Sequence, residues 1–186
     1  TAPARWLVVA DADGGAAASN SRAALPAARR EATAVARMAE AYGETSWLLV
    51  ADAATESAVK QRAGDAGHLH FAVHSEVDAV RPLESALQLR AGDGDDGALR
   101  VWEVYEQLSI DADLVVLSSC SSALGRELRG QGLLGLARAF RHAGARRVVA
   151  SLWPVEDTGT DMLMREFYAQ LAEGRPDAAL RAAVLA

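Results

Sequence analysis

The run DLVVLSSC at residues 113–120 places four consecutive branched apolar residues directly before a group of small polar residues. A short continuous apolar run is typical of a strand that is covered on both faces of a parallel sheet. Such runs predict strands at residues 6–10, 47–50, 69–73, 114–117 and 148–152. Because helical patterns alternate with them, we predict an α/β domain with a mainly parallel central sheet flanked by helices.

Amphipathic patterns predict where the helices lie. Val35, Met38 and Ala39 recur at helical spacing within residues 27–42, and Gly43 is expected to end that helix. Thr55 is the predicted N-cap of the next helix. Further helices are predicted at residues 102–108, 133–142, 161–171 and 177–185.

The segment that follows the third predicted strand departs from this alternation. Residues 74–83 are predicted to form a loop, residues 85–89 a short strand, and residues 91–97 an exposed turn rich in Gly and Asp. We therefore expect a hairpin at the edge of the domain.

Composition limits the classes of protein to which the chain can belong. Its 186 residues predict one domain, residues 1–186, and 24% charged residues are typical of a globular protein. A net charge of −6 argues against binding to nucleic acid and favours protein or peptide partners. The sequence shows neither a membrane-spanning apolar run nor a signal-peptide pattern, so a cytoplasmic location is expected. Lys60 is the only lysine among 19 basic residues, a bias that suggests a GC-rich bacterial genome.

Two reactive side chains stand just beyond predicted strands. His74 follows the strand at residues 69–73, and Cys120, the single cysteine, follows the strand at 114–117. Neighbouring parallel strands lie about 4.8 Å apart, and ligands bind beyond their carboxyl ends, so a Cys/His pair is geometrically natural. Cys120 follows His74 by 46 residues, close to the roughly 50 of caspases. The alternative is that Cys120 is a core residue and His74 a turn residue.

A Cys/His pair suits nucleophilic catalysis. An imidazole can activate a thiol and later protonate the leaving amine. The small residues at 118–122 are compatible with a sharp turn after the strand, which would let a backbone N–H group face an oxyanion.

Several stretches of the chain, in the same order, resemble the CHAT family of caspase-like peptidase domains. They are LPAARREATAVARM at 25–38, HLHFAVH at 68–74, RPLESALQL at 81–89, DLVVLSSCSSALG at 113–125, GLLGLARAFRHAGARRVVASLWPVED at 132–157 and MREFYAQLAEG at 164–174. The resemblance implies a caspase-like three-layer sandwich and a cysteine endopeptidase without a cofactor. It implies His74 and Cys120 as the dyad, with the backbone N–H groups of Ser75 and Cys120 as the oxyanion hole. It also implies an attached tetratricopeptide-repeat region.

The chain departs from the family pattern at three places. Ser75 stands where caspases have glycine, and Ser118-Ser119-Cys120-Ser121-Ser122 replaces the common Ser-Ala-Cys-Glu-Thr. The chain ends at Ala186, where members generally continue into an aromatic-rich strand. We therefore expect a fragment of a longer protein that lacks the final strand.

Residues 151–161 are expected to bind substrate. Caspase-like enzymes pair an extended peptide with the corresponding segment, and resemblance to separase implies that Asp161, and secondarily Asp157, recognises a basic P1 side chain. Ser151 and Trp153 are the other candidate substrate-binding residues. The alternative is that both carboxylates only stabilise a helix N-terminus, and that Trp153 packs in the core.

Two other functions are weighed against a peptidase. His68, His70 and His74 could suggest a zinc metallohydrolase, but no carboxylate stands at a helpful position between them. We therefore expect no metal. A catalytically silent caspase-like interaction module is the second alternative, since a fold alone does not prove activity.

Overall fold

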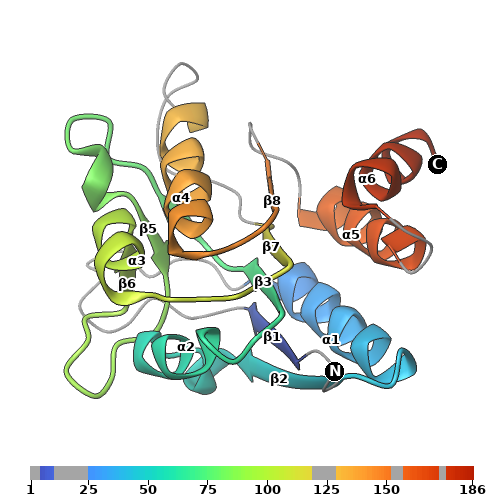
Figure 1. The fold of residues 1–186 in the computed structure, drawn as a ribbon, viewed down its shortest axis with the longest axis horizontal. Coiled ribbons are helices and arrows are strands. Elements are labelled where there is room, and N and C mark those ends of the chain that lie inside the picture. The colour runs from blue at the N-terminus through green and yellow to red at the C-terminus, as the bar shows by residue number, and fades with distance from the viewer. Residues whose placement is uncertain (1–4, 11–24, 119–128, 152–156, 172–174) are drawn as a thin grey trace.

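The computed structural model describes residues 5–10, 25–118, 129–151, 157–171 and 175–186. Its centre is a parallel sheet of five strands in the order β2-β1-β3-β7-β8 (Figure 1). The strands are β1 (Arg5–Ala10), β2 (Thr45–Val50), β3 (His68–Ala72), β7 (Leu114–Leu117) and β8 (Val148–Ala150). All five predicted strands are confirmed, although β8 ends at Ala150 and not at residue 152.

Helices cover both faces of the sheet and make the three predicted layers. The first face carries α1 (Pro26–Ala41), α5 (Asp157–Leu171) and α6 (Pro176–Leu185). The second face carries α2 (Glu56–Ala63), α3 (Val101–Gln107) and α4 (Arg129–Ala143). Figure 1 shows α5 and α6 on one side of the strands and α3 and α4 on the other.

Alternate residues of each strand enter separate cores. Leu7 and Val9 of β1 pack in the core under α2, α3 and α4, whereas Trp6 and Val8 pack in the core under α1, α5 and α6. Successive side chains of a strand point to opposite faces, so a strand that is covered on both sides must be apolar throughout. This explains why the sequence shows continuous apolar runs instead of alternating ones.

The helix ends follow from local chemistry. Thr55 caps α2 as predicted, because its side-chain oxygen accepts a hydrogen bond from the backbone N–H of Ala58 at 3.1 Å. Gly144 follows α4 with φ +122°, where a Cβ atom would lie 1.9 Å from the carbonyl oxygen of Ile110. Only glycine fits this close approach of two backbones.

A second sheet stands beside the main one. It consists of three antiparallel strands, β4 (Ser75–Glu76), β5 (Ala86–Gln88) and β6 (Ala98–Arg100). Outside the two sheets, short 3-10 helices span Ala51–Ala53 and Pro82–Glu84. The predicted hairpin is confirmed as β5 and β6. The predicted loop at residues 74–83 is wrong at its start, because Ser75 and Glu76 pair with Leu87 and Ala86.

Candidate functional site

The carboxyl ends of β3 and β7, two neighbouring inner strands, lie side by side at the carboxyl end of the main sheet. The two strands pair in parallel with Phe71 opposite Leu117. The backbone N–H of Ser118 donates to the carbonyl oxygen of Phe71 at 2.8 Å, so the ladder continues one residue past β7. His74 follows Phe71 by three residues, and Cys120 follows Leu117 by the same number.

His74 links the two sheets. It stands between β3 of the main sheet and β4 of the small sheet, and it is half-buried. Its carbonyl oxygen accepts a hydrogen bond from the backbone N–H of Gln88 at 2.8 Å, and the next residue, Ser75, pairs with Leu87. The small sheet therefore fixes the backbone on which the imidazole is carried.

Two buried hydroxyl groups mark the same edge. Ser75 is 3% exposed and Ser118 is 8% exposed. Neither Oγ atom has a hydrogen-bond partner among the residues that the structure describes. A buried hydroxyl group without a hydrogen-bond partner is uncommon in folded proteins.

Cys120 and Trp153 lie outside the described residues, so the predicted thiol-to-imidazole contact and the role of Trp153 stay predictions. Ser151 directly follows β8 and is half-buried. Asp157 is the first residue of α5. The described part of the site thus comprises His74, Ser75 and the ends of their strands.

Asp161 is paired within the domain. Its carboxylate is 11% exposed, lies on α5, and accepts a hydrogen bond from Nε of Arg165 at 2.7 Å. The Nε atom of Arg30 on α1 lies 3.9 Å from the same carboxylate. A basic substrate side chain would therefore have to compete with Arg165 for Asp161.

His68 and His70, two of the three histidines considered as zinc ligands, make contacts within the fold. His70 is 1% exposed, and its Nδ1 lies 2.9 Å from the hydroxyl of Tyr168 while its Nε2 lies 2.9 Å from Oε1 of Glu31. The ring of His68 stacks on Trp6 with centroids 4.5 Å apart, and burial lowers the pKa of His68. Both ring nitrogens of His70 are thus in contact with protein oxygens.

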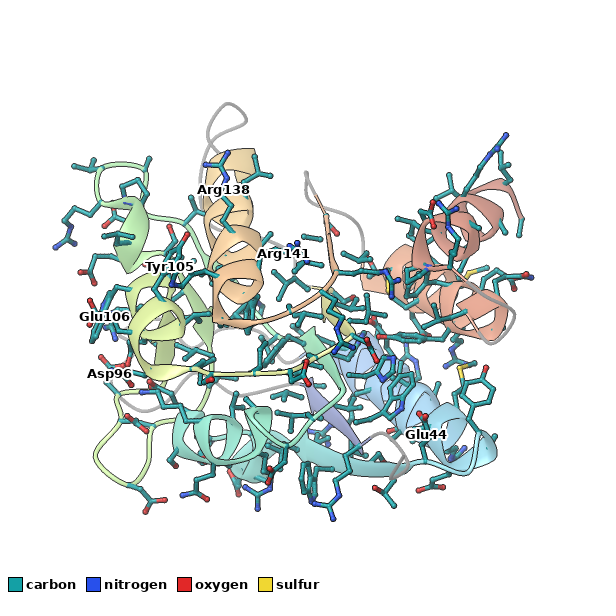
Figure 2. The ribbon with its side chains drawn as sticks, viewed as in Figure 1. Glu44, Asp96, Tyr105, Glu106, Arg138 and Arg141 are labelled. Atoms are coloured by element: carbon teal, nitrogen blue, oxygen red, sulfur yellow. The ribbon has the colours of Figure 1, made fainter. Side chains whose placement is uncertain are left out.

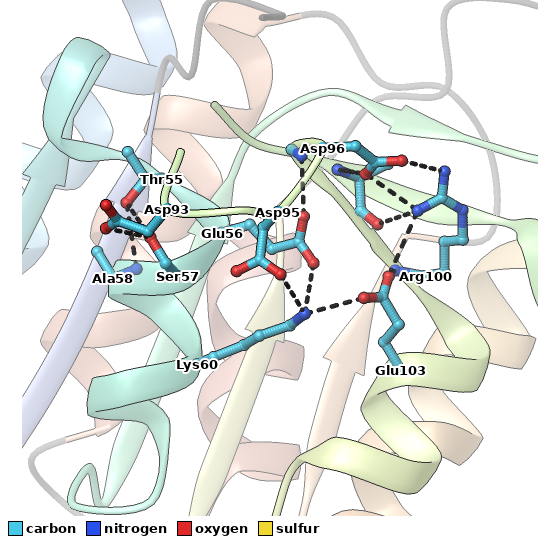
Figure 3. A network of polar contacts seen from close by, with 12 residues as sticks. Thr55, Glu56, Ser57, Ala58, Lys60, Asp93, Asp95, Asp96, Arg100 and Glu103 are labelled. Carbon is cyan, nitrogen blue, oxygen red and sulfur yellow. Dashed lines mark hydrogen bonds and ion pairs between the residues drawn. The ribbon is translucent and has the colours of Figure 1, made fainter. Parts of the chain in front are cut away.

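A cluster of charges joins the small sheet to the second helix face (Figure 3). Nζ of Lys60 lies 2.7 Å from Glu56, 2.9 Å from Glu103 and 3.0 Å from Asp95. The three carboxylates could by themselves group around a metal ion, since one oxygen of each lies within 4.8 Å of the others. The Lys60 ammonium group lies among the three carboxylates and offsets part of their negative charge.

The pKa values in this charge cluster reflect its burial. Burial alone would lower the pKa of Lys60, but the hydrogen bonds that its ammonium donates to Glu56, Glu103 and Asp95 outweigh burial and raise that pKa. Burial raises the pKa of Glu56. Burial acts in the same sense on Glu103, but the backbone N–H of Arg100 and the ammonium of Lys60 hold its pKa below the ordinary value.

Hydrogen bonds connect the charge cluster to the backbone of His74. Oε2 of Glu56 accepts from the N–H of Gly97 at 2.9 Å, and the carbonyl of Gly97 accepts from the N–H of Leu89 at 2.6 Å. The residue before Leu89 is Gln88, which donates to His74. Sequence reasoning missed this connection. The only available signal was a lone lysine four residues after a glutamate on a predicted helix.

The chain matches the CHAT domain over residues 1–186. Tetratricopeptide repeat protein 28 of mouse is 43% identical over 67 residues, which are 36% of this chain and 3% of that protein. The human protein of the same name is 39% identical over 67 residues, with the same shares. The chain therefore spans a small part of these relatives.

Two solved structures of a cysteine proteinase have a similar fold. The Arg specific cysteine proteinase gingipain R has a TM-score of 0.58 and 16% identity, and the match covers 98% of this chain and 41% of that one. A complex of the pro- and mature domains of RgpB from Porphyromonas gingivalis has a TM-score of 0.50 and 15% identity, covering 92% and 38%. The fold is thus caspase-like, as predicted. Among the described residues no helix is both long and apolar enough to span a bilayer.

Proposed function

Because this chain belongs to the CHAT domain family, we propose that it is a cysteine endopeptidase in which Cys120 is the nucleophile and His74 the general base. The observation that carries the proposal is the register of β3 and β7. It pairs Phe71 with Leu117, and His74 and Cys120 each follow one of these two residues by three positions in the sequence. The caspase-like fold shared with cysteine proteinases supports the same reading.

The proposed reaction needs few groups. The imidazole of His74 takes the proton of the Cys120 thiol, the thiolate attacks the peptide carbonyl, and the imidazolium then gives its proton to the leaving amine. The backbone N–H groups of Ser75 and Cys120 stabilise the oxyanion. A water molecule, deprotonated by His74, hydrolyses the resulting thioester. The pairing of Ser75 with Leu87 supports this assignment, since it makes the backbone at the proposed oxyanion hole rigid.

We propose that the substrate is a protein or peptide with Arg or Lys at P1. Asp161 and secondarily Asp157 would accept hydrogen bonds from the basic side chain, with Ser151 and Trp153 beside it. A carboxylate can accept two charge-assisted hydrogen bonds from a guanidinium group. Arg165 already occupies Asp161 in this way, so a basic P1 side chain would bind by displacing Arg165. The similar proteinase gingipain R is described as Arg specific.

A partner region is also proposed. The curated relatives are named as tetratricopeptide repeat proteins. We propose that this domain works in a longer chain with such repeats, which would bring substrates or regulators to it.

Thiol labelling and peptide cleavage test the proposal. A peptidyl chloromethyl ketone with Arg at P1 should label the native protein, and Cys120→Ala should abolish labelling and cleavage. His74→Ala should slow both by about a hundredfold or more, because it removes the base. His142→Ala is the matched control, since His142 packs beside Tyr105 on α3. Equal rates in His74→Ala and the native protein would refute the dyad, and a folded protein that cleaves no peptide of a P1 library would favour a silent interaction module.

The P1 preference has its own test. With the same library, the native protein should prefer Arg and Lys, and Asp161→Ala should lose this preference while labelling of Cys120 by iodoacetamide continues. An apolar preference, or unchanged cleavage after Arg in the variant, would refute the acidic pocket and leave the dyad intact.

A further inference from the structure

The small sheet supports the backbone of His74. Strand β4 has two residues, and among the described strands it pairs with β5 alone. The N–H of Gln88 on β5 donates to the carbonyl oxygen of His74 at 2.8 Å, and Leu87 of the same strand pairs with Ser75. Since so short a strand makes few hydrogen bonds of its own, the position of the His74 backbone depends on where β5 lies.

The turn between β5 and β6 is held by the segment that leads into α2. At one end of the turn, the N–H of Arg90 donates to the carbonyl oxygen of Ala54 at 2.9 Å, and the N–H of Glu56 donates to the carbonyl oxygen of Arg90 at 3.0 Å. At the other end, the carboxylate of Glu56 accepts from the buried N–H of Gly97 at 2.9 Å. Both ends of the turn are therefore fixed to the same short segment.

Gly97 connects the Glu56 carboxylate to β5. Its φ is +88°, and a Cβ atom there would lie 2.7 Å from the carbonyl oxygen of Leu89, so the two backbones are in close contact. The carbonyl oxygen of Gly97 accepts from the N–H of Leu89 at 2.6 Å. Leu89 directly follows Gln88, the donor to His74. A shift of Gly97 would therefore move the end of β5 that is bonded to His74.

The carboxylate of Glu56 has a fixed place against this turn. Its side chain is 1% exposed and lies 2.7 Å from Nζ of Lys60, which also binds Asp95 of the turn at 3.0 Å (Figure 3). Asp96, which Figure 2 shows near the start of α3, pairs with Arg100 at 2.7 Å. Ion pairs on both sides thus hold the turn to α2 and to the start of α3.

On the basis of the dyad proposed above, we propose that Glu56 is a positioning residue for His74, acting through Gly97 and β5. A general base must lie within about 2.6–3.2 Å of the atom whose proton it takes, and a misplacement of about 1 Å costs about a hundredfold in rate. Loss of the Glu56 carboxylate would leave the buried N–H of Gly97 without its acceptor. The turn would then move to satisfy that group, and β5 and the imidazole would move with it.

Amide hydrogen exchange tests this connection without a substrate. In Glu56→Ala the exchange rate of the Gln88 N–H, relative to those of the β1 amides, should rise about tenfold, because local opening no longer breaks one hydrogen bond. Val35→Ala is the matched control, since it removes buried methyl groups from α1 on the other face of the sheet. It should lower the stability of the whole domain and leave this ratio unchanged.

Two milder variants separate the hydrogen bond from the charge. Glu56→Gln keeps an oxygen that can accept from Gly97, and it should restore most of the native ratio. Glu56→Asp withdraws the carboxylate from Gly97 by one methylene group and should raise the ratio as Glu56→Ala does. It takes the place of Glu56→Ala if that variant does not fold.

Alkylation by iodoacetamide tests the consequence for the dyad. Cys120 is the single cysteine, so the reagent reports on it alone. A free thiol has a pKa of about 8.5 and depends on a nearby imidazole to react at pH 6. Glu56→Ala should therefore slow alkylation about tenfold at pH 6 and little at pH 9. In peptide cleavage kcat should fall by the same factor with KM unchanged, whereas Val35→Ala should behave like the native protein.

Two results would overturn the proposal. An unchanged ratio for Gln88 in Glu56→Ala would show that the turn does not hold β5. A raised ratio with native alkylation and native kcat would show that the imidazole keeps its place without Glu56. Equal alkylation of His74→Ala and the native protein at pH 6 would instead refute the dyad, and the exchange of Gln88 would still decide whether Glu56 holds the backbone of His74.

Discussion

Removal of the ammonium group of Lys60 should destabilise the domain in a pH-dependent way. In Lys60→Met the carboxylates of Glu56, Glu103 and Asp95 would face each other without a cation. The side chain of Lys60 is 17% exposed, and those of Glu56 and Glu103 are 1% and 7% exposed, so solvent screens the cluster poorly. Breaking such a buried pair costs about 3–5 kcal/mol, and because Asp95 is partly exposed we expect about 3 kcal/mol at pH 7.

The pH dependence follows from the carboxylates. The ordinary pKa of Glu56 is 4.5, and burial already raises it in the native protein. Without Lys60 the pKa of Glu56 rises further in the folded state, and the pKa of Glu103 rises because it loses the ammonium group that helps to lower it. Between pH 4.5 and these raised values the folded variant binds more protons than the unfolded one, so its stability falls as the pH rises. The deficit should be small near pH 4.5 and largest at pH 7 and above.

Urea unfolding at pH 5 and pH 7.5 measures this difference in the free energy of unfolding. In thermal unfolding at neutral pH the Tm should fall by about 6–12 °C, since each kcal/mol shifts the Tm of a domain of this size by about 2–4 °C. Arg62→Met is the control, because it removes a charge from the same helix outside the cluster, and it should change the stability by less than about 0.5 kcal/mol. The reasoning is refuted if Lys60→Met loses equal stability at both pH values.

A divalent cation should replace the lost ammonium. In Lys60→Ala, millimolar Mn²⁺ should raise the Tm, because the three carboxylate oxygens lie within 4.8 Å of one another. The native protein should show no such rise. A variant that Mn²⁺ leaves unchanged would show that the carboxylates separate when Lys60 is removed.

Substitutions at three further residues test the packing, each by urea unfolding. Gly144→Ala should destabilise by about 3 kcal/mol or more, because its Cβ would lie 1.9 Å from the carbonyl oxygen of Ile110; a loss below about 1 kcal/mol would contradict this. Tyr168→Phe should lose about 1–2 kcal/mol, because Nδ1 of buried His70 loses its hydroxyl partner; unchanged stability would show that this contact is weak. Thr55→Ala should lose about 1 kcal/mol and Thr55→Ser much less, whereas equal losses would rule out the cap.

The main sheet was predictable because its signal is local. Each strand is a continuous apolar run, and the structure confirms the five runs to within two residues at each end. The prediction failed where a strand depends on a distant partner. Ser75 and Glu76 carry no periodic pattern, and they form β4 only because Leu87 and Ala86 lie opposite them. Helix α5 begins at Asp157, four residues before the prediction, in a stretch whose threonines and glycine have low helix propensity.

The place of His74 in the fold was predictable for the same reason, because it follows a recognisable strand. The contact between Cys120 and His74 stays a prediction. The positions of Glu56, Asp95 and Glu103 around Lys60 could not, because these residues come from two helices and a turn that meet only in the folded domain. The contact of buried Glu31 with His70 likewise joins a helix to a strand distant in sequence.

The single lysine also gives the domain one side-chain amine whose reactivity depends on the folded state. Lys60 provides the only side-chain amine of these 186 residues, and three carboxylates hold it in a protonated form that does not react with acylating reagents. Amine-directed crosslinkers and dyes should therefore react slowly with the folded domain. The rate of acylation at Lys60, followed by mass spectrometry, would report how often the small sheet separates from α2, with no engineered label.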